Sequence, residues 1–95
     1  MGIDKIIDNI VNKMISRLGQ LEMAFITGDY AEGKDSGIID LILVGDVNSK
    51  NLHGYVEKAE GLIKRKIRTL VLNNEEFERN RKSLLADTAL WLWKR

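Results

Sequence analysis

The chain has no cysteine and no proline, a single histidine, and almost no excess of charge of either sign. Without cysteine it can form no disulfide framework and can use no thiolate in catalysis. The net charge of +1 differs from the basic excess of most stand-alone nucleic-acid-binding proteins. The first ten residues, MGIDKIIDNI, mix acids with apolar residues, unlike a signal peptide. No stretch approaches the roughly 18 to 20 apolar residues of a membrane span. These absences favour a cytoplasmic protein without membrane contact.

The length and composition predict one small soluble domain. The chain has 95 residues, 44% of them hydrophobic and 31% charged, which is ordinary for a globular protein. It contains no low-complexity run and no polar linker, so residues 1–95 are interpreted as a single domain.

Hydrophobic periodicity predicts a mixed sheet with helices packed on it. Isoleucine, valine, methionine and leucine recur at spacings of three and four over residues 3–18, which indicates an amphipathic helix. Further helices are predicted over residues 49–64 and 75–85, and strands over residues 22–27, 38–44 and 66–72. The strand, helix, strand order of residues 38–72 implies two parallel neighbouring strands. Residues 89–95 favour an edge strand, with a helical tail as the alternative, and the fold class is α/β (α+β).

The loop at residues 28–37, GDYAEGKDSG, and the strand after it carry the polar residues of interest. Gly28 and Gly33 fit tight turns that need a positive φ. Asp40 interrupts an apolar strand, and a carboxylate there must be paired, hydrogen-bonded or exposed. Our first hypothesis is that Asp40 accepts hydrogen bonds from loop amides and so fixes the turn at residues 28–37. The alternative is that it faces a ligand cleft, with Asp29 and Lys34 within reach.

Two further hypotheses concern side chains of this loop. Asp29 and Asp35 are candidates to form an acidic cation pocket together with Asp40. Tyr30 follows the Gly-Asp turn, and its ring is expected to fill the cleft and become part of the core.

The stretches TGDYAEG and IIDLILVGD resemble the minimal nucleotidyltransferase fold. That family has a strand, a Gly-Ser turn, a loop, a strand with Asp-x-Asp, and a third carboxylate on the following strand. The resemblance implies that the turn brings backbone amides close to a triphosphate. It also implies that the three acids hold Mg²⁺, which stabilises charge developing on the phosphate oxygens.

The chain departs from this pattern at several positions. Gly28 matches the glycine and Asp40 matches the second aspartate, but Asp29 stands in place of the serine and Ile38 in place of the first aspartate. The loop is about two residues shorter than usual for the family, and the third strand offers Arg68 and Thr69, with no acid. The resemblance therefore implies a remnant catalytic motif of Gly28, Asp29 and Asp40, with no metal ligand set. Candidate ligand contacts are Gly28, Gly33 and Lys34.

Nearly the whole chain also resembles the C-terminal domain of a group of winged-helix transcriptional regulators, found especially in Bacteroidetes. That resemblance implies a bacterial, non-enzymatic regulatory or assembly domain with no cofactor. DNA would bind only through a separate N-terminal winged helix, for which residues 1–95 offer no helix-turn-helix pattern. The alternative is an active or nucleotide-binding nucleotidyltransferase that uses Mg²⁺ and ATP.

Three further features of the sequence have interpretations of their own. Trp91 and Trp93 lie near the end of the sequence, and tryptophans there more often anchor onto a sheet edge or a dimer partner than bind a ligand, so a homodimer interface is predicted at them. The basic residues of 62–68, LIKRKIR, fit the negative end of a helix, with a phosphate-contacting patch as the alternative. His53 has no partner for metal binding or base catalysis nearby in the sequence and is predicted to lie on the surface.

Overall fold

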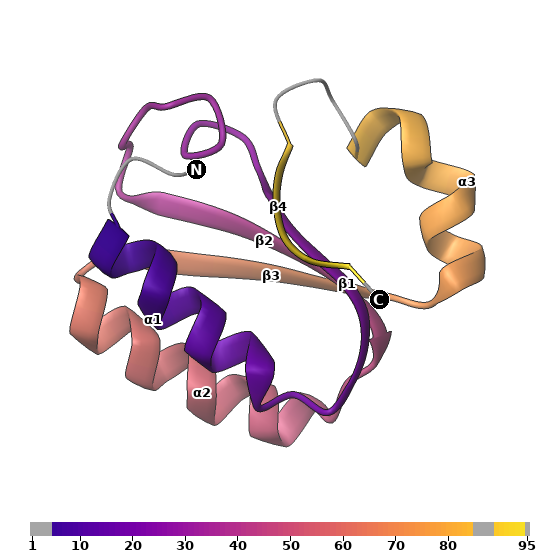
Figure 1. Cartoon of the computed structure of the whole chain (residues 1–95), viewed down its shortest axis with the longest axis horizontal. Coiled ribbons are helices and arrows are strands. Elements are labelled where there is room, and N and C mark those ends of the chain that lie inside the picture. The colour runs from indigo at the N-terminus through magenta and orange to yellow at the C-terminus, as the bar shows by residue number, and fades with distance from the viewer. Residues whose placement is uncertain (1–4, 85–88, 95) are drawn as a thin grey trace.

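A computed structural model describes residues 5–84 and 89–94 of the chain (Figure 1). In these residues the elements follow one another as α1 (Lys5–Ser16), β1 (Gln20–Thr27), β2 (Ile38–Asp46), α2 (Ser49–Ile63), β3 (Lys66–Leu72), α3 (Asn74–Leu84) and β4 (Leu90–Lys94). The strands form one sheet in the order β3-β2-β1-β4. None of the described helices is long and apolar enough to cross a membrane.

The sheet is mixed, as predicted. β2 pairs with β1 antiparallel and with β3 parallel, so the strand, helix, strand unit has the expected orientation. The last strand, β4, lies antiparallel along β1 at the sheet edge, which confirms the edge strand and excludes the helical tail over the described residues. β2 is two residues longer than predicted, because Gly45 and Asp46 continue the pairing with β1 instead of forming a turn.

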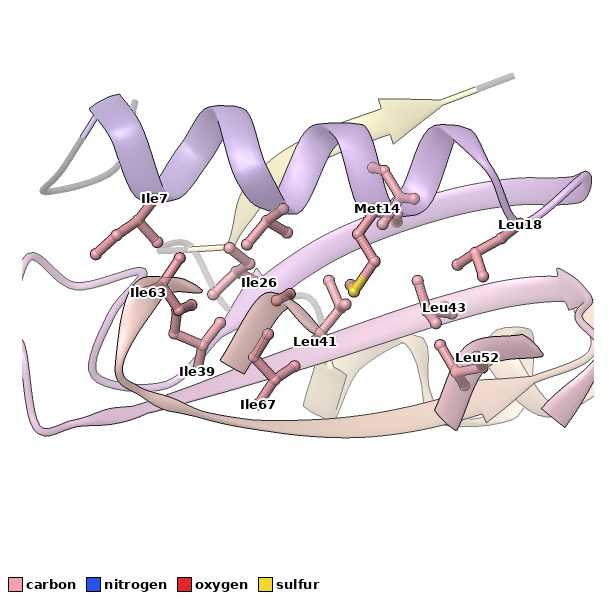
Figure 2. Close-up of a cluster of buried hydrophobic side chains, with 14 of the residues drawn as sticks. Ile7, Met14, Leu18, Ile26, Ile39, Leu41, Leu43, Leu52, Ile63 and Ile67 are labelled. Carbon is pink, nitrogen blue, oxygen red and sulfur yellow. The ribbon is translucent and has the colours of Figure 1, made fainter. Parts of the chain in front are cut away.

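One face of the sheet is covered by α1 and α2, which lie side by side (Figure 1). Alternate residues of β2, namely Ile39, Leu41 and Leu43, are fully buried on this face. Figure 2 shows them meeting side chains of both helices, among them Met14 and Leu52. The isoleucine-rich face of α1 is therefore mainly part of the hydrophobic core.

The other face of the sheet has a smaller core and is only partly covered. Phe77 of α3 packs against Phe25, their ring centroids 6.0 Å apart, at one end of this face. Ile42 and Val44 of β2 belong to the same cluster. Asp40 is the next residue of β2 on this face, beyond the part that α3 covers. The sheet thus has a closed side under two helices and a half-open side that carries Asp40.

Local capping explains where two helices begin. The side chain of Asn48 accepts hydrogen bonds from the amides of Lys50 and Asn51, so it is the residue that caps α2. Asn73 and Glu76 each accept a hydrogen bond from the other's backbone amide, a capping box at the start of α3. The predicted ends at residues 3, 4, 85 and 95 lie outside the described residues.

Candidate functional site

The turn after β1 brings the predicted glycine and aspartate together. Gly28 has a φ of +76°, a conformation that side chains other than hydrogen disfavour. A methyl group placed on Gly28 would lie 2.8 Å from Oδ2 of Asp40. The backbone of the turn therefore lies directly against the carboxylate, in the proximity that the motif predicts.

The partner of Asp40 is an arginine of the neighbouring strand. Arg68 is in register with Asp40, and its Nε donates to Oδ1 at 2.7 Å while its Nη2 donates to Oδ2 at 3.1 Å. The hydrogen bonds and the charge of Asp40 raise the pKa of Arg68 above its usual value. Because Arg68 is 59% exposed and Asp40 30% exposed, this pair contributes little to stability. Its effect is to occupy both carboxylate oxygens.

The hypothesis that Asp40 fixes the loop through its amides is wrong, since its hydrogen bonds go to Arg68. Asp35 has that role. It accepts a hydrogen bond from the amide of Gly37 at 3.2 Å, and Nε of Arg65 donates to its two oxygens at 3.0 and 2.9 Å. These contacts, first the side-chain hydrogen bond from Arg65, lower the pKa of Asp35 below its ordinary value of 3.8. The reason is local, because an aspartate inside a turn readily reaches the amide two residues on.

The acidic cation pocket is not formed. Asp35 and Asp40 each pair with a different arginine, and Asp29 is exposed. In the part of the chain that the structure describes, no group of three or more histidine and acidic side chains is placed to hold a metal ion. Lys34 is also exposed and forms no ion pair with Asp40 within those residues.

Tyr30 is part of the core, but on the side of the sheet opposite Asp40. Its side chain is 1% exposed and belongs to the larger core under the helices. Its hydroxyl donates to Oδ1 of Asp8 on α1 at 2.9 Å. The expectation that the ring fills the cleft beside Asp40 is therefore wrong, because the turn at Gly28 directs the next residues toward α1. Asp8 was not among the predicted residues, and its position beside Ile7 on α1 is the signal in the sequence that could have identified it.

The three positions at which the nucleotidyltransferase pattern places acids are on one face of the sheet. Ile38 and Asp40 are two residues apart in β2 and so point to the same side. Arg68 is directly opposite Asp40 in β3. Of these three side chains one is apolar, one acidic and one basic, and the acidic and basic ones, Asp40 and Arg68, form the ion pair.

The architecture is that of the nucleotidyltransferase fold. The chain is similar to the solved structure of a nucleotidyltransferase candidate from Sulfolobus solfataricus, with 25% identity and a TM-score of 0.55, over 96% of this chain and 79% of that one. It is also similar to a chain in the complex of the tri-AMPylated HEPN toxin of Shewanella oneidensis with its MNT antitoxin. That match has 10% identity and a TM-score of 0.63, over 96% of this chain and 72% of that one.

A toxin-antitoxin structure with AMP-PNP gives a TM-score of 0.67 at 12% identity, over 93% of this chain and 73% of that one. The two matches near 10% identity bear on the fold alone. No protein-family model and no curated protein sequence matches the chain.

The remaining candidates have simple structural positions. His53 is exposed on α2, which confirms its surface location, and its Nε2 is 3.1 Å from Oε1 of Glu57. Of the basic residues after α2, Arg65 pairs with Asp35 of the loop and Arg68 pairs with Asp40. Trp91 and Trp93 are 41% and 49% exposed on β4. Trp91 packs on Phe25 with ring centroids 4.9 Å apart.

Proposed function

We propose that this chain is a non-enzymatic regulatory or assembly domain, built on a nucleotidyltransferase fold whose metal site has been replaced by an ion pair. The observation that carries the proposal is the two-point contact of Arg68 with Asp40. In the nucleotidyltransferase pattern the cation beside this aspartate is a metal. Here a positive charge of the protein itself takes that place.

The chemistry of Mg²⁺ and of the arginine side chain supports the replacement of a metal site by an ion pair. Mg²⁺ needs near-octahedral oxygen coordination and loses its water reluctantly, so a single carboxylate is a poor site for it. The guanidinium group of arginine is always charged and matches both oxygens of a carboxylate. At the neighbouring position Ile38 offers no oxygen at all. In addition, Asp29 places a negative charge next to Gly28, where the pattern would bring a phosphate.

The regulatory part of the proposal rests on the sequence resemblance to the C-terminal domains of winged-helix regulators. In that arrangement the domain contacts DNA only through a separate winged-helix segment, and its own task is to pair two copies. Trp91 and Trp93 support pairing, because exposed tryptophans on an edge strand supply large apolar contact area.

Changing both tryptophans to serine is expected to raise the dimer dissociation constant at least about tenfold, because tryptophans are often central to interface energy. Sedimentation equilibrium over a range of concentrations measures the change. Leu62→Ser, which alters an exposed leucine on α2 away from β4, is the control and should leave the constant unchanged. A native chain that stays monomeric at millimolar concentration contradicts the pairing.

The second candidate is a nucleotide-binding or active nucleotidyltransferase that uses Mg²⁺ and ATP. It is favoured by the close approach of Gly28 to Asp40 and by the similarity to the nucleotidyltransferase candidate of Sulfolobus solfataricus. A domain that binds nucleotide without transferring it, as an effector sensor, is a variant of this candidate.

An NMR titration with ATP and then Mn²⁺ separates the two candidates. The proposal predicts no shifts and no manganese broadening at Gly28, Asp29 or Asp40 at about millimolar ligand, because Arg68 already neutralises the carboxylate. Asp40→Asn is the matched control, since it removes the carboxylate and keeps the shape. Broadening in the native chain that this substitution abolishes would establish the second candidate instead.

A further inference from the structure

A groove runs between the outer surfaces of α1 and α2, on the side of the sheet away from Asp40. It encloses about 300 Å³. Its apolar surface comes from Ile10 and Met14 of α1 and from Tyr55, Ala59 and Leu62 of α2. Leu62 is 62% exposed, and together with Ile10 and Tyr55 it forms a contiguous apolar surface in the groove.

Three cationic side chains surround the apolar surface of the groove. Lys13 and Arg17 of α1 and Lys58 of α2 line the groove, and its described lining contains no acid. None of the three is in a salt bridge with another described residue. The nearby acids of α2 are engaged elsewhere: Glu57 contacts His53, and Glu60 accepts a hydrogen bond from the amide of Ile67. The three cations of the groove therefore have no ion-pair partner among the described residues.

The groove extends along α1 in a helical pattern. A second hollow shares Ile10 and Lys13 with it and adds Ile6, which is 70% exposed. Ile6, Ile10, Lys13 and Arg17 are spaced by four, three and four residues, so they form one stripe of α1. Tyr55, Ala59 and Leu62 form the facing stripe of α2 at spacings of four and three. Two such stripes with a hollow between them match the shape of a third helix.

We propose that this groove binds an acidic amphipathic helix of a partner protein. The apolar side of such a helix, with anchors at i, i+3, i+4 and i+7, covers Leu62 and Ile10, and its carboxylates meet Lys13, Arg17 and Lys58. A second copy of this chain is a poor occupant, because pairing groove to groove brings the cations of one copy against those of the other. An anionic membrane suits the charge, but a flat surface does not enter the hollow.

The test uses the whole chain and a designed peptide of about 18 residues, roughly five helical turns, with leucines at those spacings and glutamates on both sides of them. The expected result is a set of NMR shifts confined to α1 and α2, weakened by added salt. The same peptide with lysine in place of glutamate should bind at least about tenfold more weakly, since it brings like charges together.

Two double variants locate the site. Lys13→Glu with Lys58→Glu should weaken binding of the acidic peptide at least about tenfold and favour the lysine peptide. Lys50→Glu with Lys82→Glu makes the same change in net charge at exposed positions outside the groove and should leave binding unchanged. Leu62→Ser should weaken both peptides, because it removes an apolar contact that they share.

Three outcomes overturn the proposal. The first is the absence of shifts at millimolar acidic peptide. The second is equal weakening by the two double variants, which indicates attraction by net charge alone. The third is binding to vesicles of phosphatidylglycerol and phosphatidylcholine without binding of the peptide, which assigns the surface to lipid. None of these results depends on nucleotide or metal binding, so they do not bear on the proposed function.

Discussion

Replacing Gly45 by alanine should destabilise the domain by about 3 kcal/mol, from backbone strain and overpacking together, although only one methyl group is added. Gly45 is in β2 opposite Leu21, where β1 contains a register shift between Leu21 and Met23. Its φ of +145° lies in a region that residues with a side chain rarely adopt. An added methyl group would also lie 3.0 Å from the amide nitrogen of Glu22 and closer still to the carbonyl oxygen of Gln20.

The cost is large because the obstructing atoms belong to the backbone. A side chain can turn away from a new methyl group, but here the paired strand itself must move. For a domain of this size the loss corresponds to a fall in melting temperature of about 12 to 24 °C. Urea denaturation followed by circular dichroism measures the free energy of unfolding directly.

Two other glycines are the controls. Gly19 also has a positive φ, +79°, but a methyl group there would meet nothing within 4 Å, so Gly19→Ala isolates the backbone cost. Gly54 is inside α2 with open space around it, and Gly54→Ala should stabilise the domain by up to about 1 kcal/mol through helix propensity. Equal effects of the Gly45 and Gly19 substitutions would show that the contact with β1 carries no cost.

Changing Ile38 and Arg68 together to aspartate should create a Mn²⁺ site. The variant has three carboxylates on one face of the sheet. One new aspartate is two residues before Asp40 in β2, and the other is directly opposite Asp40 in β3. Without metal these acids repel one another, and a divalent cation relieves that repulsion while gaining oxygen ligands. We expect a Mn²⁺ dissociation constant below about 1 mM, at least about tenfold lower than that of the native chain. The reason is that the affinity of such a site increases with the number of charged oxygen ligands.

Manganese broadening of backbone resonances and a metal-dependent rise in melting temperature both report this site. The double variant Ile38→Asn with Arg68→Asn is the matched control, since it has the same shape and lacks the two new charges. If the aspartate variant folds but binds no Mn²⁺, the three positions do not converge on one cation, and the metal interpretation of the pattern at these residues fails.

The order and type of the elements could be predicted from the sequence because each has a strong local signal. Apolar runs identify β2 and β3, and the spacing of apolar residues by three and four identifies α1. The end of β2 was predicted two residues too early, because a glycine such as Gly45 is typical of a turn. In the structure Gly45 lies in the strand, opposite the register shift of β1 between Leu21 and Met23.

The candidate site was predicted less well, since pairing across strands is not visible in one sequence. Arg68 was recognised as a base where the pattern has an acid, but its contact with Asp40 depends on a parallel register that only the structure fixes. That Asp35 holds the loop in place of Asp40 depends likewise on Arg65, which is 30 residues away from Asp35 in the sequence. Tyr30 was predicted correctly to be in the core, but on the face of the sheet that carries Asp40. The glycines of the loop indicate that the chain turns, but they do not indicate toward which face of the sheet it turns.

The pairing of Asp40 with Arg68 also has an evolutionary consequence. Arg68→Asp alone sets two unpaired carboxylates opposite each other, and Ile38→Asp alone leaves the guanidinium in the place of a metal. In the presence of a divalent metal, each single substitution is therefore expected to gain less than the pair of substitutions, a case of epistasis between residues in contact. On the proposed function, a lineage that carries this ion pair gains a metal site only by changing both residues, and neither change is favoured before the other is present.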